Sequence, residues 1–544
     1  MRDDLMDLRN EPDPSRLIYG LRDTGYTFNT AAADIVDNSI AAGADEVNVR
    51  IELQADGRKF VYFGDNGQGM DRAKLSAAMR YGAPQRENLA SLGKFGLGLK
   101  TASSAICLRY TVISRSDPTD PLHKLAWDLE HVADRDQWEM LSEPVSADEE
   151  EVFEELCGET GTLVIWSKCD RLLAKNYDEP GGTKEKRAVT SLIQRLKDHF
   201  ALIYYRFLDA SDERERNVLI TVNDEPVEAW NPFYPEKSEQ VLAPSQQEIE
   251  IELEDGSIEH ASIKAWILPH SKDISKEEND TKAKITNRAQ GFYIHREGRI
   301  IQQGGWLHVF GSPEPHTSLL RIEFDFSHTL DSAFNVDVKK SQILFDPALE
   351  EGLRELLRPV YREAGSRYRR TMKAAAVEKG VDHGSSNRSI ESAKTAKKPN
   401  VLSADSDSQT AIVSNNRGPN IRLRVPVQNN VDPLNVYVDA VTDITSGRLW
   451  EPAMRSTTSD GHVASVRVNK HHDFYQKIYL KAAALGYAVE GMDLLLWALS
   501  TAEQNNTDEE LSDMFEDIRT EVSQNLEKLL RDVPMPSERD LDEL

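Results

Sequence analysis

The chain has 544 residues, of which 39% are hydrophobic and 29% are charged. This balance is typical of globular proteins and excludes a disordered or collagen-like chain. At about 150 residues per domain, the length predicts three or four domains. Basic residues number 65 and acidic residues 92, so the formal net charge is −27. That charge disfavours a globally basic nucleic-acid binder, although a local basic surface remains compatible with it.

Cysteine content and hydropathy further restrict the class of protein to which the chain can belong. The three cysteines, Cys107, Cys157 and Cys169, lack the spacing of a zinc site or a disulfide framework. Residues 1–16 are charged and carry no apolar segment of the kind found in signal peptides. No run of about 18 apolar residues occurs, as a membrane-spanning helix would require. We therefore expect a cytoplasmic protein without a membrane span.

Helix and strand patterns alternate through the first third of the chain. Asn29 and Thr30 are predicted to cap an Ala-rich amphipathic helix that ends near Gly43. Strands are then predicted at residues 47–51, 59–67, 111–115 and 162–167, the first two joined by a hairpin turn at 55–57. Together these elements predict one α/β domain over residues 1–175.

A second domain is predicted over residues 176–380. Its candidate strands are 218–222, 249–253, 261–268, 292–295 and 320–326, with turn signals at Asp255-Gly256 and Glu297-Gly298. A helix over 347–379 follows and is rich in arginine. Its basic residues include Arg354, Arg358, Arg362, Arg367, Arg369, Arg370 and Lys373.

The remaining sequence predicts a linker and a third domain. Residues 381–419 are mostly Ser, Asn, Lys, Asp and Gly, the composition of a flexible linker. Residues 420–534 begin with two strand patterns and continue with an apolar and an acidic helix, predicting an α+β domain for dimerisation or interaction. Residues 535–544 form an acidic tail. His471-His472-Asp473 has no further metal ligand at suitable spacing, so a loop is the better interpretation.

Two short segments carry residue types suited to a nucleotide site. In residues 34–38 (DIVDN), Asp34 and Asn38 are four apart and share one helical face, about 5–6 Å apart at Cβ. Such a carboxylate and carboxamide suit a water molecule and Mg²⁺, which prefers oxygen ligands. In residues 64–70 (GDNGQGM), Asp65 ends an apolar strand, and the glycines after it permit close approach of a flat ring.

A third segment, residues 93–103 (GKFGLGLKTAS), is a Gly-rich turn that runs into a helix. Backbone N–H groups at such a helix start suit an anion. Each of the three segments has an ordinary alternative: a solvated helix face, a simple turn, or a Gly-rich turn without a preceding strand. Their combination, followed by Gly161-Thr162 at the start of a strand, resembles the GHKL (Bergerat-fold) ATPases, a superfamily that includes gyrase, histidine kinases, MutL and MORC. The resemblance covers residues 30–166.

The resemblance implies an α/β sandwich that binds ATP and Mg²⁺. Asn38 would be the Mg²⁺ ligand, and Asp65 would accept from the adenine amino group. The adenine site would also include Gly67, Gly69, Met70 and Thr162. The phosphate site would include Gly93, Lys94, Phe95, Gly96, Leu97, Gly98, Lys100 and Thr101. Residues 81–92 would form a lid that orders over ATP.

The general base departs from the family pattern. The family carries Glu there, and this chain carries Asp34, which is one methylene shorter. A base must lie within hydrogen-bond reach of the attacking water. Asp34 would therefore support slow hydrolysis after a small helix shift or through a second water, or the site binds ATP with little turnover. Asp37, three residues later, either tunes the pKa of Asp34 or is an ordinary helix residue.

The second domain narrows the resemblance to MutL and MORC. Residues 291–306 (GFYIHREGRIIQQGGW) resemble the hairpin of their transducer domain, which is of the ribosomal-protein-like β-α type. Residues 334–345 resemble the loop that delivers a lysine to the γ-phosphate, which implies a catalytic role for Lys340, with Lys339 as second candidate. Two lysines on a solvated loop are the alternative. The whole chain is thus predicted to be α+β.

These motifs predict an ATP-operated, homodimeric clamp with slow Mg²⁺-dependent ATPase activity. Its predicted setting is a DNA transaction: repair, genome maintenance or bacterial antiviral defence. The basic helix would contact DNA phosphates, or it is merely solvated. The alternative functions are a nucleotide-sensing scaffold in a multi-protein complex and a chaperone-like ATPase that acts on protein partners.

Overall fold

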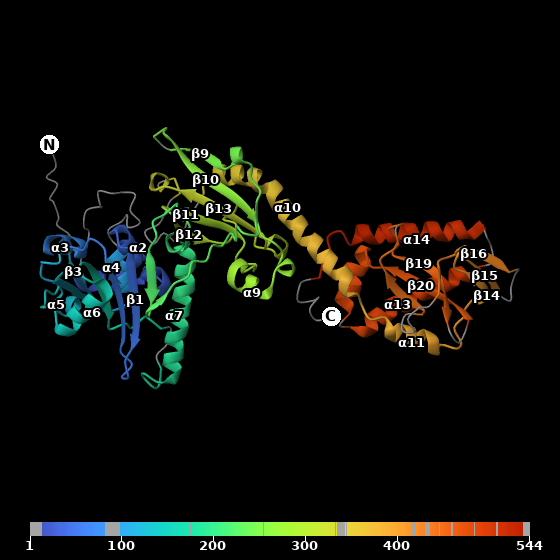
Figure 1. Ribbon diagram of the computed structural model, residues 1–544, viewed down its shortest axis with the longest axis horizontal. Coiled ribbons are helices and arrows are strands. Elements are labelled where there is room, and N and C mark those ends of the chain that lie inside the picture. The colour runs from blue at the N-terminus through green and yellow to red at the C-terminus, as the bar shows by residue number, and fades with distance from the viewer. Residues whose placement is uncertain are drawn as a thin grey trace, which may run out of the picture. The chain divides into compact units, whose positions relative to one another are not determined.

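The computed structural model describes residues 13–536 except for 82–97, 174–176, 254, 332, 335–342, 344, 415–419, 430–435, 445, 458–460, 484 and 507–509. The chain divides into two compact units, Met1–Gly365 and Ser366–Leu544 (Figure 1). Both units combine helices with β-sheets, which confirms the predicted α+β class.

Among the described residues of the first unit, a seven-stranded sheet has the order β4-β3-β5-β2-β1-β6-β7. Its strands are β1 (Glu46–Leu53), β2 (Lys59–Asp65), β3 (Arg109–Arg115), β4 (His123–Asp128), β5 (Gly161–Ser167), β6 (Leu219–Val222) and β7 (Glu225–Pro226). Strands β1 and β2 pair antiparallel, with Val47 opposite Asp65, so the predicted hairpin is confirmed. Strands β3 and β5 lie at the predicted positions. Strand β5 pairs with β2 on the edge opposite β1, and β3 pairs with β5.

Strand β6 corrects one prediction. The sequence pattern assigned residues 218–222 to the second domain, whereas β6 pairs in parallel with β1, and Glu46 lies opposite Leu219. A parallel pair requires a long crossover connection. Here that connection includes α7 (Thr183–Ile203), and a local pattern cannot indicate such a distant partner strand.

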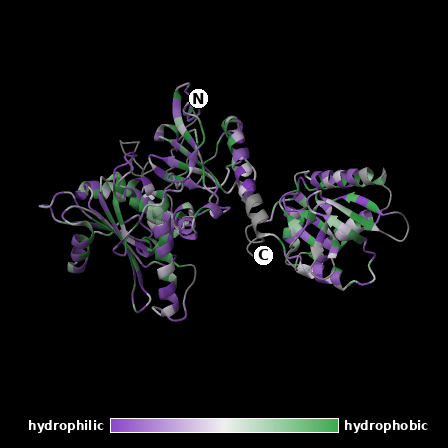
Figure 2. Cartoon of the chain, turned by 45° about the vertical axis from the view of Figure 1, so that its right-hand side comes forward, coloured by the Kyte–Doolittle hydropathy of each residue, from purple (hydrophilic) through white to green (hydrophobic). Residues whose placement is uncertain are grey.

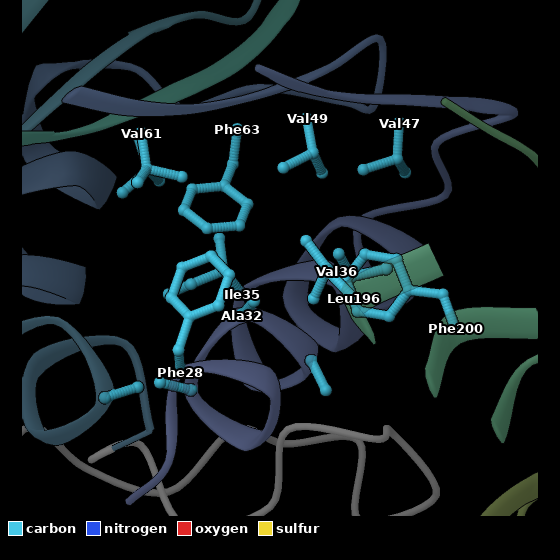
Figure 3. Close-up of a cluster of buried hydrophobic side chains, with 14 of the residues drawn as sticks. Phe28, Ala32, Ile35, Val36, Val47, Val49, Val61, Phe63, Leu196 and Phe200 are labelled. Atoms are coloured by element: carbon cyan, nitrogen blue, oxygen red, sulfur yellow. The ribbon is translucent and has the colours of Figure 1, made fainter. Parts of the chain in front are cut away.

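Helices cover both faces of the seven-stranded sheet. Helix α2 (Phe28–Ala41) and α7 pack on one face, and α6 (Ala147–Cys157) packs on the other. Figure 3 labels Val47, Val49, Val61 and Phe63 of the strands opposite Phe28, Ala32, Ile35 and Val36 of α2 and Leu196 and Phe200 of α7. Because strand side chains alternate between faces, a slip of one residue would move this set to the opposite face, away from α2 and α7, and the packing therefore fixes the register. The other helices of this part are α1 (Pro14–Gly20), α3 (Arg72–Met79), α4 (Gly98–Ile106), α5 (Leu129–Arg135) and α8 (Tyr205–Leu208).

A second sheet in the same unit has the order β12-β11-β13-β10-β8, and β9 also pairs with β10. Its strands are β8 (Glu239–Gln240), β9 (Glu248–Glu252), β10 (Ile258–Ile267), β11 (Gly291–Arg296), β12 (Arg299–Gln303) and β13 (Leu320–Phe326), with the short helix α9 (Lys276–Glu278) between β10 and β11. Strands β11 and β12 form the hairpin predicted at 291–306. Helix α7 contacts both α2 and β12, so it connects the first sheet to this hairpin.

Helix α10 (Pro347–Lys379) has the bounds predicted from the sequence and runs from the first unit into the second. The second unit contains the sheets β14-β15-β16 and β17-β19-β20-β18. Their strands are β14 (Asn400–Asp405), β15 (Thr410–Ser414), β16 (Ile421–Arg424), β17 (Val427–Gln428), β18 (Val438–Val441), β19 (Trp450–Thr457) and β20 (Gly461–Asn469). The helices are α11 (Gly384–Ser392), α12 (Leu480–Ala482), α13 (Gly486–Gln504) and α14 (Glu510–Leu529). Hydrophobic residues, green in Figure 2, gather on the strands in both units.

The second unit corrects the predicted linker. Residues 381–419 were expected to be flexible, but α11, β14 and β15 form within them. The polar side chains of this segment have structural partners: the Oδ1 of Asn387 accepts the N–H groups of Tyr437 (2.6 Å) and Val438 (3.0 Å). Composition alone does not predict these elements, because it does not show which polar side chains are buried with hydrogen-bond partners.

The described residues contain neither a candidate membrane span nor a candidate cluster of metal ligands. None of the helices there is long and apolar enough to cross a bilayer. No cluster of three or more His, Cys, Asp or Glu side chains suited to a metal ion occurs in the same part of the chain. His471 and His472 lie just before a helix, as the sequence predicts.

Candidate nucleotide-binding site

Helix α2 carries Asp34 and Asn38 on one face. The helix is capped by Thr27, whose side chain accepts the N–H of Thr30, so it begins slightly before the predicted cap at Asn29 and Thr30. Asp34 is only 4% exposed, which excludes the solvated-face alternative for this residue. Its Oδ2 accepts a hydrogen bond from the Tyr26 hydroxyl (2.6 Å).

The Asn38 carboxamide is oriented by its own helix. Its Nδ2 donates to the backbone carbonyl of Asp34 (2.8 Å). Because the nitrogen is held in this way, the oxygen is the atom that would meet a metal ion. A single protein oxygen is sufficient for Mg²⁺, which keeps several waters and takes further ligands from phosphates.

Asp65 is a buried carboxylate at the end of β2. It is 5% exposed. Its Oδ2 accepts from the Ser39 hydroxyl (2.8 Å), and its Oδ1 accepts from the Gly67 N–H (3.0 Å). Burial raises the pKa of Asp65, although the hydrogen bonds from Ser39 and the backbone oppose that effect. A carboxylate can accept about four hydrogen bonds, so this group has capacity for a donor from a ligand.

Glycines bring three backbone segments close together around Asp65. Gly69 has φ 58°, and a Cβ there would lie 2.0 Å from the carbonyl oxygen of Arg115. Gly161 has φ 136°, and a Cβ there would lie 1.8 Å from the carbonyl oxygen of Asp65. Neither position tolerates a side chain, because backbone atoms already occupy the space that a Cβ would need. Access of a flat ring to Asp65 remains a prediction.

The Thr162 side chain lies beside Asp65 and is held by a serine that the sequence analysis missed. Thr162 is opposite Asp65 in the pairing of β2 with β5. Its hydroxyl lies 2.9 Å from the Ser114 hydroxyl, which donates to Gly161 O and accepts from the Met70 N–H (both 2.8 Å). Ser114 thus joins three elements of the site. It carries no local motif, and only the pairing of β3 with β5 identifies it.

Helix α4 begins next to Asp34 and contributes two further predicted residues. A Cβ on Gly98 would lie 3.5 Å from Asp34 Oδ2, so the start of α4 faces the catalytic candidate. Thr101 hydrogen-bonds to Tyr26, which in turn binds Asp34. Burial and the Asp34 charge raise the pKa of Tyr26, so this tyrosine remains a hydrogen-bond donor.

Lys100 is a further residue of the predicted phosphate site. It is buried, and its Nζ donates to the carbonyl of Ala78 at the end of α3 (2.9 Å). The ammonium group therefore ties α4 to α3, and a contact with phosphate remains a prediction. Gly93, Lys94, Phe95, Gly96, Leu97, Lys339 and Lys340 lie outside the described residues, as does the predicted lid after Tyr81.

Asp37 has a structural environment that the sequence did not indicate. It is completely buried, and its Oδ1 accepts from the Tyr204 hydroxyl (2.8 Å). Its Oδ2 lies 3.0 Å from a guanidinium nitrogen of Arg299 in β12. Burial of the His199 ring, with Arg299 nearby, lowers the pKa of this histidine to about 4. Asp37 is thus part of a buried network with Tyr204 and Arg299.

Comparison with known proteins agrees with this geometry. Residues 26–161 match the family described as histidine kinase-, DNA gyrase B- and HSP90-like ATPases. The domain formed by these residues, called the GHKL domain below, belongs to the GHKL superfamily. The GHKL domain contains every described residue of the predicted nucleotide site except Thr162, which directly follows the matched range.

Two further proteins are similar to the chain. The protein MICRORCHIDIA 4 of Arabidopsis thaliana is 34% identical over 90 residues, which are 16% of this chain and 11% of that protein. A solved structure, the N-terminal domain of a DNA repair protein, aligns over 66% of this chain and 98% of its own, at 16% identity and a TM-score of 0.36. The first match supports the resemblance to MORC, and it spans a small part of that relative's length.

Proposed function

We propose that the GHKL domain binds Mg²⁺ and ATP, with the adenine amino group donating to Asp65. The observation that carries this proposal is the buried Asp65 carboxylate in a glycine-lined setting, where Gly69 and Gly161 leave room for no side chain. A buried charged group without enough hydrogen bonds is costly, and a ligand amino group reduces that cost. Calorimetric titration of ATP into the intact protein, beside Asp65→Asn, tests this assignment.

Around the phosphates, we assign Asn38 to Mg²⁺ and Asp34 to the attacking water. The support is their shared face on α2 and the position of Gly98 beside Asp34. Mg²⁺, when bound, would neutralise charge on the phosphates. Asp34 would orient and deprotonate the water, while the Tyr26 hydroxyl holds one carboxylate oxygen. Lys340 keeps its predicted role as the cation that approaches the γ-phosphate.

At the level of the assembly, we propose an ATP-operated homodimeric clamp of the MutL/MORC type. Large apolar side chains are exposed on two helices of the second unit and support a dimerisation role: Leu495 (61% exposed) and Leu499 on α13, and Met514, Ile518 and Val522 on α14. If ATP binds only the closed form, it shifts the equilibrium towards that form. Light scattering with and without a non-hydrolysable ATP analogue and Mg²⁺ tests the clamp, and an unchanged mass and shape would contradict it.

DNA is the proposed client of the clamp, in repair, genome maintenance or antiviral defence. Arg358 and Arg362 are one helical turn apart on α10, and both are exposed. Such a pair suits phosphate contacts, which weaken as salt concentration rises. Retention of DNA that requires the ATP analogue and decreases with salt would support this proposal. The cytoplasmic location remains a prediction from sequence.

One observation favours a second candidate, a nucleotide-sensing scaffold with little hydrolysis that acts on protein partners. Asp34 is shorter than the usual glutamate, and one of its oxygens already accepts from Tyr26. Phosphate release by the wild type and Asp34→Ala separates the two candidates. Equal rates would favour the scaffold, whereas a clear loss in the variant supports a slow ATPase.

A further inference from the structure

A buried ion pair connects the second sheet to the catalytic face of α2. Arg299 begins β12, and its guanidinium lies 3.0 Å from the Asp37 carboxylate of α2. Arg299 is 5% exposed and Asp37 is completely buried, so water does not screen the pair effectively. The Tyr204 hydroxyl donates to Asp37 Oδ1 and lies 2.8 Å from the carbonyl oxygen of Ala33 as well.

The position of Arg299 is set by the hairpin from which it projects. The preceding residues, Glu297 and Gly298, have φ 47° and 74°, values typical of a tight type I′ turn. A Cβ on Gly298 would lie 2.1 Å from the Glu215 carboxylate. The Glu297 carboxylate also accepts the N–H of His328 (2.8 Å). Arg299 therefore cannot move far unless the hairpin moves with it.

On α2, the pair acts next to both proposed site residues. Asp37 directly precedes Asn38 and follows Asp34 by three residues, so displacement of its carboxylate rotates or shifts both neighbours. Tyr204 holds the backbone at Ala33, one residue before Asp34. The positive charge of Arg299 also acts electrostatically on Asp34 and Tyr26. No local sequence pattern indicates this contact, because its partners lie more than 250 residues apart.

We infer that Arg299 is a positioning residue that couples the β11–β12 hairpin to the nucleotide site, holding Asp34 and Asn38 in a geometry competent for hydrolysis. The inference rests on the proposed ATPase function. A group that positions the reacting residues affects turnover more than affinity, because a displacement of about 1 Å can reduce the rate by about 100-fold. The proposed contact of the nucleotide base is at Asp65 on β2, not on α2, so ATP affinity should depend less on Arg299 than turnover does.

The test compares conservative variants of full-length protein. Arg299→Lys keeps the charge but shortens the reach, and Tyr204→Phe removes only the hydroxyl. Arg296→Lys is the matched control, because Arg296 lies in the same hairpin, is equally buried, and pairs with Asp331 (2.7 Å). We expect Arg299→Lys and Tyr204→Phe to lower kcat by about 10-fold or more with ATP affinity within about 3-fold of wild type. Arg296→Lys should retain wild-type kcat even if its melting temperature falls.

Two additional measurements make the result decisive. Combining Arg299→Lys with Asp37→Glu lengthens the carboxylate to meet the shorter cation and should restore part of the lost kcat. Hydrogen exchange of α2 amides without nucleotide should increase in Arg299→Lys and stay unchanged in Arg296→Lys. Wild-type kcat in Arg299→Lys would overturn the inference. An equal loss of kcat in Arg299→Lys and in the control Arg296→Lys would overturn it as well. If wild type does not bind ATP, the proposed function fails, and the exchange result alone decides whether Arg299 positions α2.

Discussion

Replacing Asp65 by asparagine separates the cost of burying a carboxylate from its use in binding. Asparagine has nearly the same size, and its oxygen can still accept the Gly67 N–H. The Ser39 hydroxyl, which now donates to Asp65, has a second acceptor in the carbonyl of Ile35 at 3.5 Å. The local structure should therefore persist, while the site loses one charged acceptor.

The expected loss of affinity follows from that single acceptor. A hydrogen bond to a charged group contributes about 1.5–3 kcal/mol, and about 1.4 kcal/mol corresponds to a tenfold change in Kd. ATP should thus bind Asp65→Asn about 10- to 100-fold more weakly. Stability should change in the opposite direction. Because burial raises the pKa of Asp65, its stabilising contribution is present below the unfolded pKa of 3.8 and is lost as pH rises through the folded pKa. At neutral pH the wild type has lost this stabilisation, whereas asparagine carries no charge to bury. Asp65→Asn should therefore be as stable as the wild type or more stable.

Calorimetric titration with ATP and urea denaturation at pH 7 measure the two effects on the same protein. Asp45→Asn is the control, since it removes the same charge from a side chain that is 82% exposed. Weaker binding with equal or greater stability supports the assignment of Asp65. Wild-type affinity in Asp65→Asn would refute it, and so would an equal loss of affinity in Asp45→Asn.

Three further predictions concern catalysis, backbone and pH. Asp34→Asn should lower the phosphate-release rate by about 100-fold or more with little change in ATP affinity; an unchanged rate would exclude Asp34 as the base. Gly161→Ala should lower the free energy of unfolding by at least about 2 kcal/mol, because its Cβ would meet a backbone carbonyl at 1.8 Å. Gly158→Ala also has a positive φ, 77°, but its Cβ would have no atom within 4 Å, so it should lose less in urea denaturation. The pKa of His199 is lowered from 6.5 to about 4, so the folded state resists protonation and stability falls as pH decreases through this window. The difference corresponds to about 3 kcal/mol, and His199→Gln should flatten that part of the pH–stability curve; identical curves would contradict the prediction.

Much of the nucleotide site could be predicted because its residues lie in short, ordered segments. The strand before Asp65, the helix with Asp34 and Asn38, and the start of the strand at Thr162 were all expected, and the GHKL family was identified from them. The structure also confirms the predicted arginine-rich helix over residues 347–379. These features depend on local periodicity and on glycine, which a sequence displays directly.

The missed features depend on contacts between distant segments. Ser114 joins the site only through strand pairing, and the Arg299–Asp37 ion pair depends on how the hairpin packs against α2. The hydrogen bond from the Lys100 ammonium to a carbonyl of α3 likewise depends on how α4 packs against α3. Residues 381–419 were predicted to be flexible, since composition does not reveal that Asn387 is buried with partners. Tertiary packing decides all of these cases.

The claim on which the whole account depends is that the GHKL domain holds an adenine nucleotide. Equilibrium dialysis of radiolabelled ATP with Mg²⁺ against the full-length protein measures this directly. We expect saturable retention of one nucleotide per chain, which excess unlabelled ATP displaces. No retention at millimolar ATP, in protein shown to be folded, would contradict it.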